Sequence, residues 1–298
     1  MTTATLFNYS FSLTQPNPRA HVPQTIRKIV IVGGGSAGWM TAMMLADVLL
    51  PKGVEIVVLE SPIVGVIGVG EGSTPWLRGF FDKLGIEEPE WMPACHATYK
   101  CGITFDKWST KPGFERYFPP FAPMPDNLPL PQFVHNVNAR VGGGDVHAHP
   151  NRFFIASTLA DQDLAPKPNR NFPFDVWYGY HFDAVLLGQF LHKKAIERGV
   201  KYQSCHVKQV QLAENGDIAS VVIDDSTTIA GDFFVDCTGF AGLMIQQALK
   251  TPFVSFSNNL FNDAAVAMPT TIGEDIPAQS VSTARKHGRA WTLPTTNP

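Results

Sequence analysis

The sequence lacks an excess of charge of either sign, and it lacks any long uninterrupted apolar run. Its 298 residues carry 23 lysines and arginines against 26 aspartates and glutamates, which gives a formal net charge of -3. Without a basic patch or a block of like charge, the chain does not resemble a nucleic-acid-binding protein or one attached to a membrane by a polybasic segment. No apolar run is long enough to cross a bilayer. We therefore expect a small-molecule partner.

Cysteine is equally scarce. The chain contains no C-x-x-C pair and no zinc-ligand spacing among its four cysteines, which are Cys95, Cys101, Cys205 and Cys237. Such scatter through a chain of this size is not typical of a disulfide framework, so we expect free thiols in a reducing cytoplasm. His147 and His149, beside a glycine-rich stretch, are the one candidate metal pair, and a solvated loop is the favoured interpretation. No metal is predicted.

What the chain does have is enough apolar sequence for a large core. Apolar residues make up 44% of it and charged residues only 16%, which is typical of a globular protein. Residues 1–27 are polar and proline-containing, without the basic and apolar regions of a signal peptide, and are predicted to be a disordered leader. Residues 28–298 are predicted to form one domain.

The first organised segment is a strand, a glycine turn and a helix. Beginning at Lys28, KIVIVGGGSAGWM places Gly33, Gly35 and Gly38 at the G-x-G-x-x-G spacing. This spacing permits a tight turn, the close approach of a pyrophosphate and the packing of the helix on the strand. The helix N-terminus at Ser36 and Ala37 would face the phosphates.

A second strand, VEIVVLE, follows and ends in Glu60, about 20 residues after the last glycine. An acid at this position accepts the ribose hydroxyls of a bound dinucleotide. The order of strand, glycines, helix, strand and acid favours a Rossmann-like unit. A turn without a ligand, with Glu60 as a solvated strand end, is the alternative.

NAD(P) and FAD both use this unit, and later segments separate them. From Asp183 we expect a capped helix that stops near Gly199 and leads into one strand continuing to about Val210. Strands at 218–223 and 232–236 follow, separated by turns. A β-meander that closes on the sequence DCTGF resembles the second half of the FAD domain in glutathione-reductase-like and aromatic-hydroxylase-like flavoproteins, which favours FAD.

Five motifs together resemble the flavin-dependent halogenases of the tryptophan-halogenase family. They are GGGSAGWM, GVIGVGEGSTPWLRGFF, TYKCGITFDKW, YHFDA and DFFVDCTGF, in the order of that family, within a likeness that covers residues 28 to 294. The resemblance implies an α/β fold with a Rossmann-like FAD-binding domain of the glutathione-reductase and aromatic-hydroxylase type and an incomplete substrate region.

The resemblance also gives a role to Lys100, the lone charge in HATYKCGITF. In the family, reduced FAD, dioxygen and halide yield a hypohalous species that a lysine presents to an aromatic substrate. A separate flavin reductase supplies the reduced flavin. The matching lysine is Lys100, and an ammonium suits the role because its protons can hydrogen-bond the hypohalous oxygen. A lysine that snorkels from a strand to the surface is the alternative.

Other site residues carry over by the same matching. The glycine turn and helix start, Gly33, Gly35, Ser36, Ala37 and Gly38, are expected at the FAD phosphates. Glu60 is expected at the ribose and the backbone of Val207 at the adenine. Residues 68–74, GVGEGST, with Gly70 and Glu71, correspond to a strap along the flavin. Gly72 stands where better-known members have alanine.

Some residues depart from the family pattern. The signature W-x-W-x-I-P reads Arg289-Ala290-Trp291-Thr292-Leu293-Pro294 here, so its first tryptophan is missing. Pro119 and Phe121 replace the pair that holds indole in tryptophan-specific members, within a proline-rich stretch that is either a covering loop or an aromatic-lined pocket.

A P-L-E-S-T-G segment is also absent from the sequence, and we expect a truncated member or a fragment of a longer protein. Three functions therefore remain open. They are a halogenase of an indole-like, pyrrole-like or phenol-like ring, a flavoprotein monooxygenase, and a non-catalytic FAD-binding remnant.

Overall fold

The computed structural model describes residues 25–65, 68–121, 124–168, 171, 173–271, 273 and 275–296. Nearly all of the predicted leader, up to residue 24, lies outside these ranges, so its disorder stays a prediction. The single domain predicted for residues 28–298 likewise stays a prediction.

Four parallel strands form the central sheet, in the order β12-β1-β2-β8. These are β1 (Lys28–Val32), β2 (Glu55–Glu60), β8 (Lys201–Ser204) and β12 (Phe233–Asp236). The middle strands β1 and β2 are apolar along almost their whole length because both faces of a parallel sheet are covered. The predicted α/β class is confirmed.

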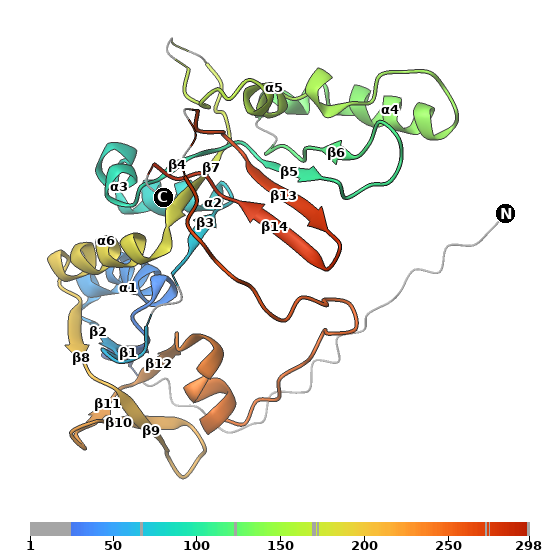
Figure 1. Ribbon diagram of the computed structural model, residues 1–298. Coiled ribbons are helices and arrows are strands. Elements are labelled where there is room, and N and C mark those ends of the chain that lie inside the picture. Colours follow the sequence, from blue (N-terminus) through green and yellow to red (C-terminus); the bar gives the residue numbers. More distant parts are fainter. Residues whose placement is uncertain are drawn as a thin grey trace.

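Two helices cover one face of this sheet and lie side by side in Figure 1, α1 (Ser36–Leu49) and α6 (Ala184–Glu197). The predicted cap of α6 is confirmed, since the carboxylate of Asp183 accepts hydrogen bonds from the backbone N–H groups of Val185 and Leu186 at 2.8 and 2.9 Å. The side chains of Ile29 and Ile31 pack in the core on this helical side.

An antiparallel meander covers the other face and consists of β9 (Val207–Leu212), β10 (Ile218–Ile223) and β11 (Thr228–Ala230). Val30 and Val32 of β1 pack against Val221 and Ile223 of this meander. Alternate residues of β1 thus enter two cores, as the two-residue period of a strand requires. The predicted meander is confirmed, and its return strand, β12, pairs with β1.

The single strand predicted to run from Gly199 to Val210 is wrong. The chain divides at Cys205 and His206, where β8 ends in the parallel sheet and β9 begins in the meander. The N–H of Cys205 still donates to the carbonyl of Glu60 at 2.9 Å. Beyond that bond the backbone turns away to pair with β10, because the two sheets lie on different levels (Figure 1).

Two smaller sheets lie beyond the helical side of the parallel sheet (Figure 1). The first has the order β3-β7-β4, with β3 (Gly70–Gly72), β4 (Thr98–Lys100) and β7 (Gly179–Asp183). The second has the order β14-β13-β5-β6, with β5 (Ile103–Asp106), β6 (Arg116–Tyr117), β13 (Ser280–Arg285) and β14 (Gly288–Thr292).

Shorter elements complete the described chain. The remaining α-helices are α2 (Trp76–Leu84), α3 (Glu88–Ala94), α4 (Leu130–Val141) and α5 (Ile155–Asp161). Single helical turns are η1 (Leu50–Lys52), η2 (Met124–Asn127), η3 (Pro150–Arg152) and η4 (Gly239–Ala241), and η5 (Leu243–Ala248) is a π-helix. In Figure 1, α4 and α5 lie above the β5 and β6 sheet.

Candidate active site

The glycine turn between β1 and α1 is packed tightly at two of its three motif glycines. A methyl group at Gly33, where φ is +113°, would lie 2.1 Å from the carbonyl oxygen of Cys237. A methyl group at Gly38 would lie 1.9 Å from the carbonyl oxygen of Gly33, whereas one at Gly35 would meet nothing within 4 Å. The first and third glycines therefore allow close packing, and the second leaves an open space at the turn.

A cavity of about 130 Å³ opens at this second glycine. Ser36 and Glu60 line it together with residues of α6, including Val185 and Gly188. No side chain caps the start of α1, so the backbone N–H groups of its first turn, at Ser36 and Ala37, are available to an anion. The structure brings together the predicted phosphate-binding turn and the predicted ribose-binding acid.

Glu60 ends β2 and lies against the glycine turn, where a methyl group at Gly34 would come within 2.2 Å of its carboxyl carbon. Val207, the predicted adenine contact, begins β9 just after the Cys205 to Glu60 backbone bond. Val207 is only 7% exposed and pairs with Ile223 of the meander, so its contact with adenine stays a prediction. Glu60 and Val207 thus lie at neighbouring strand ends.

The predicted strap, residues 68–74, connects the cavity with Lys100. Its first residue packs on α6, since a methyl group at Gly68 would lie 1.9 Å from a methyl carbon of Val185, a cavity residue. The strap then forms β3, in which Gly70 pairs with Asp183 of β7. At the end of β3, a methyl group at Gly72 would lie 2.9 Å from Lys100 Nζ.

Lys100, at the end of β4, is only 4% exposed. Burial is the one cause that lowers the pKa of its ammonium, to about 8, and within the described ranges no hydrogen bond or ion pair holds the Nζ atom. The Nζ atom lies 5.6 Å from the centroid of the Phe121 ring. The alternative of a snorkelling surface lysine is therefore wrong.

The chain beside Lys100 contains a buried histidine that the sequence analysis did not select. His181 of β7 is fully buried, and its ring contacts the hydroxyl of Thr98 through Nδ1 at 3.1 Å and that of Ser280 through Nε2 at 2.9 Å. Burial, and secondly the charge of Lys100, lower the pKa of His181 to about 3. It is therefore neutral. The alternation of T-Y-K with Y-H-F was the available signal, since Thr98 and Lys100 of one strand point to the same face as His181 of the other.

The altered tryptophan signature lies beside the same strands. Leu293 approaches the strap, with its Cβ 3.9 Å from a methyl group placed at Gly70, and the carbonyl of Pro294 accepts a hydrogen bond from Thr98 at 2.6 Å. Arg289, which replaces the first tryptophan, has its guanidinium carbon 5.3 Å from the centroid of the Trp291 ring. Arg289 therefore stacks on the second tryptophan and does not act as an aromatic wall of its own.

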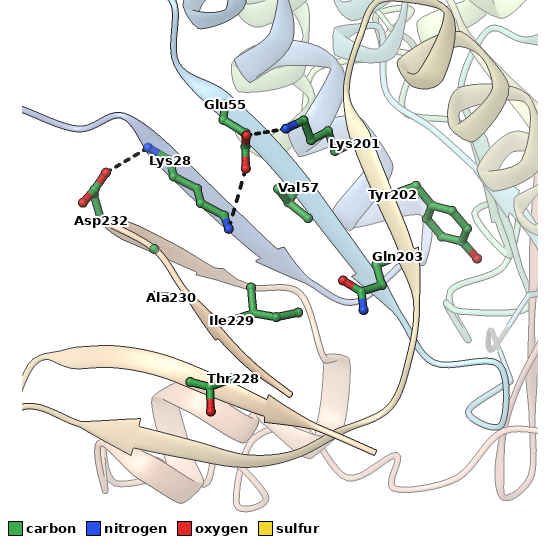
Figure 2. A pocket seen from close by; sticks show the side chains of 11 residues that line it. Lys28, Glu55, Val57, Lys201, Tyr202, Gln203, Thr228, Ile229, Ala230 and Asp232 are labelled. Atoms are coloured by element: carbon green, nitrogen blue, oxygen red, sulfur yellow. Dashed lines mark hydrogen bonds and ion pairs between the residues drawn. The ribbon is translucent and has the colours of Figure 1, made fainter. Parts of the chain in front are cut away.

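A larger cavity, of about 570 Å³, lies at the other end of the parallel sheet, where its strands begin (Figure 2). Lys28 and Lys201 at the amino ends of their strands both pair with Glu55, and the carboxylate of Asp232 accepts the backbone N–H of Lys28 at 2.9 Å. These charges neutralise one another. Ligands of open α/β sheets bind at the carboxyl ends of the strands, so the smaller cavity at the glycine turn is the candidate site.

Other predicted features have simpler outcomes. All four cysteines are free thiols, as expected. Among the described residues, no group of three histidine, cysteine, aspartate or glutamate side chains is arranged to hold a metal ion. In the same part of the chain, no helix has the length and apolar character needed to cross a membrane.

Known proteins resemble this chain over most of its length. The tryptophan 6-halogenase SttH of Streptomyces toxytricini is 36% identical over 90% of this chain and 55% of its own length. The tryptophan 7-halogenase RebH of Lentzea aerocolonigenes is 35% identical over 90% and 53%. The crystal structure of a tryptophan halogenase from Shewanella frigidimarina has a TM-score of 0.80 at 31% identity, covering 92% of this chain and 55% of that one.

This chain spans about half the length of the curated relatives it matches. The likeness to solved structures, with the parallel sheet, confirms the predicted Rossmann-like fold of the FAD-binding type. Residues 28–297 match the family described as tryptophan halogenase. The chain therefore belongs to the tryptophan halogenase family.

Proposed function

We propose that this protein is an FAD-dependent halogenase in which Lys100 presents a hypohalous species to an electron-rich, indole-like ring. One observation carries the proposal. The strap residues 68–74 contact the glycine-turn cavity at one end, through Gly68 and Val185, and Lys100 at the other, through Gly72. The glycine turn would hold the phosphates of FAD, and the strap would connect that cofactor site with Lys100.

The residues at the turn fit FAD. An open space at Gly35, uncapped N–H groups at Ser36 and Ala37 and the tight packing at Gly33 and Gly38 suit a pyrophosphate. Glu60 is suited to accept the ribose hydroxyls, the backbone of Val207 would face the adenine, and Gly70 and Glu71 would lie along the flavin. Bound in its reduced form, FAD supplies the reaction of dioxygen with halide that yields the hypohalous species.

Lys100 would act on that species through its protons. With a pKa of about 8 it is mostly an ammonium at neutral pH, and it holds its protons at Nζ. Hydrogen bonds from Nζ to the hypohalous oxygen withdraw electrons from the halogen, which makes it more electrophilic toward a ring. Burial strengthens these bonds because little water competes for the ammonium.

The substrate is proposed to be an electron-rich aromatic ring. The curated relatives are tryptophan halogenases by name. Phe121 lies within 5.6 Å of the Lys100 ammonium and offers one aromatic wall. With Pro119 it stands where tryptophan-specific members have a different pair, so we propose an indole-like ring and not free tryptophan in particular.

Partners and place of action belong to the same proposal. A separate reductase would supply reduced FAD by diffusion, with halide and dioxygen as co-substrates. Four free thiols suit a reducing cytoplasm. No nucleic acid is expected as a partner, because the chain has near-balanced charge.

A monooxygenase is the second candidate. Arg289 favours it because it replaces the first tryptophan of the W-x-W-x-I-P signature, which in the family keeps substrates away from the flavin and so prevents monooxygenation. The test is turnover of indole with a flavin reductase, FAD, NADH and bromide. Brominated indole supports the halogenase, and hydroxylated indole that forms equally without bromide supports the monooxygenase. A chain that co-elutes with stoichiometric FAD but modifies no indole, pyrrole or phenol would be the non-catalytic remnant. The matched control is Lys100→Met, which should retain FAD and lose bromination.

A further inference from the structure

The ammonium of Lys100 is surrounded by residues of three other strands, β3, β7 and β13. A methyl group placed at Gly72 of β3 would be 2.9 Å from Lys100 Nζ, 3.1 Å from Ser280 Oγ and 3.4 Å from His181 Cδ2. These three atoms therefore lie close together beside the α-carbon of Gly72, where even a methyl group would be crowded. Ser280 is fully buried and begins β13, where its N–H donates to the carbonyl of Gly102 at 3.2 Å.

The hydrogen bonds that link Thr98, His181 and Ser280 have a fixed direction. The hydroxyl of Thr98 donates its single proton to the carbonyl of Pro294 at 2.6 Å. Toward His181 it can only accept, so the proton of the neutral imidazole is on Nδ1. Nε2 then carries a lone pair and accepts the hydroxyl proton of Ser280 at 2.9 Å.

It follows that Ser280 offers only lone pairs to its other neighbours. The ammonium of Lys100 is a donor of three protons, and no acceptor in the described part of the chain takes them. Ser280 Oγ and Lys100 Nζ each lie about 3 Å from the same point beside Gly72, so the two atoms are no more than about 6 Å apart, within the range that one bridging water molecule can span.

We propose that Ser280 is a positioning residue that accepts a hydrogen bond from the Lys100 ammonium through one bridging water, and that His181 fixes its hydroxyl in this role. The assignment deepens the proposed function and rests on it, because Lys100 is the residue that would contact the reagent. Ser280 would fix the direction in which the remaining N–H groups point.

No carboxylate in the described ranges acts as the hydrogen-bond acceptor of the Lys100 ammonium. Asp183, two residues beyond His181 on β7, uses its side chain to cap α6. Glu71 precedes Gly72, so its side chain points to the other face of β3. Phe121 contributes only a ring face. A hydroxyl acceptor can orient the ammonium without an ion pair that would raise its pKa.

The test is a nitrogen-15 NMR titration of lysine Nζ in the full chain, with the Lys100 signal assigned by its loss in Lys100→Met. In Ser280→Ala we expect the midpoint of Lys100 to fall by about one pH unit, since an acceptor of a charged donor is lost. Ser280→Thr keeps the hydroxyl and should titrate as the parent. The matched control, Ser282→Ala, removes a buried hydroxyl on the same strand that lacks a described hydrogen-bond partner, and should also titrate as the parent.

Ser280→Cys keeps the shape of the side chain with a weaker acceptor, so it should lower the midpoint even if Ser280→Ala fails to fold. An unchanged midpoint in whichever of these variants folds would overturn the assignment. A second readout is indole bromination. We expect kcat to fall about tenfold in Ser280→Ala, with KM unchanged. In Ser280→Thr we expect kcat to equal that of the parent. If the variants show these midpoint shifts but the parent protein brominates no indole, the halogenase proposal fails and the contact between Ser280 and Lys100 stands.

Discussion

Tyr99 and Lys100 are neighbours in sequence and belong to opposite faces of β4. The hydroxyl of Tyr99 donates to the carboxylate of Glu88 at 3.0 Å, while the ammonium of Lys100 lies beside Gly72 on the other side of the sheet. One face of this short strand is thus tied to a structural cluster and the other carries the candidate catalytic group. Because successive side chains of a strand point to opposite faces, two adjacent residues can serve a structural cluster and a candidate catalytic site.

Replacing Lys100 with methionine should stabilise the protein at neutral pH. The pKa of Lys100 is lowered from 10.5 to about 8, so below pH 8 the folded protein bears the full cost of a buried ammonium, on the order of 3 kcal/mol. Between pH 8 and 10.5 the unfolded chain binds more protons, and this cost is relieved as the pH rises.

Urea unfolding of both proteins from pH 6 to 10 measures the effect. The stability gain of Lys100→Met should be greatest below pH 8 and shrink above it, while the exposed Lys193→Met should show no such trend. A gain for Lys100→Met that is constant across this range would contradict a lowered pKa.

Alanine at two motif glycines should separate folding from flavin binding. Gly38→Ala would push a methyl group into the carbonyl of Gly33 and should destabilise the protein by about 3 kcal/mol or more. Gly35→Ala meets nothing within 4 Å and should cost less than about 1 kcal/mol, yet its methyl group fills the space proposed for the pyrophosphate.

We therefore expect Gly35→Ala to fold with near-normal stability and to bind FAD at least tenfold more weakly, measured by flavin fluorescence quenching. Gly79→Ala is the control, a helical glycine on α2 with open space around it, and should bind FAD normally. Normal FAD affinity in Gly35→Ala would rule out a pyrophosphate at this turn.

Glu88 should contribute stability that depends on pH. Its carboxylate accepts hydrogen bonds from Tyr178 at 2.6 Å and Tyr180 at 2.8 Å, besides Tyr99, and pairs with Lys167 at 2.8 Å. Burial alone would raise the pKa of Glu88, but the Lys167 and tyrosine hydrogen bonds outweigh it and lower the pKa. The stabilisation is therefore present above the unfolded pKa and is lost as the pH falls through the folded one.

Glu88→Gln should cost about 2 kcal/mol at pH 7 and less at pH 4, by urea unfolding. Glu90→Gln is the control, because its exposed ion pair with Lys194 should contribute under about 1 kcal/mol. A loss for Glu88→Gln that is equal at both pH values would show that charge plays no part in the cluster.

Removing the hydroxyl of Thr98 should destabilise the protein, because this hydroxyl is a hydrogen-bond partner of the buried His181. Thr98→Val leaves the buried Nδ1–H of His181 and the carbonyl of Pro294 without this partner, at a cost of about 1–3 kcal/mol. Ser157→Ala removes a buried hydroxyl that has no described hydrogen-bond partner, so it should change stability little. Thermal unfolding of the two variants should differ by several degrees, and equal melting temperatures would contradict a stabilising role for the hydrogen bonds of Thr98.

The sequence alone determined the dinucleotide half of the fold. The strand before Gly33, the helix after it and the second strand ending at Glu60 follow from local signals, namely apolar runs, glycine spacing and a terminal acid. The cap at Asp183 is equally local, because an N-cap depends on the three residues that follow it. Lys100 was identified through family resemblance and not through its surroundings in sequence.

Only the tertiary structure decided what surrounds Lys100 and where the long predicted strand divides. The break at Cys205 comes from pairing with two different sheets, one through Glu60 and the other through β10. Residues 72, 100, 181 and 280 are far apart in sequence and meet because β3, β4, β7 and β13 converge. The pKa of Lys100 depends on this burial, and burial is a property of the packed chain, since a local pattern contains no information about which distant residues exclude water.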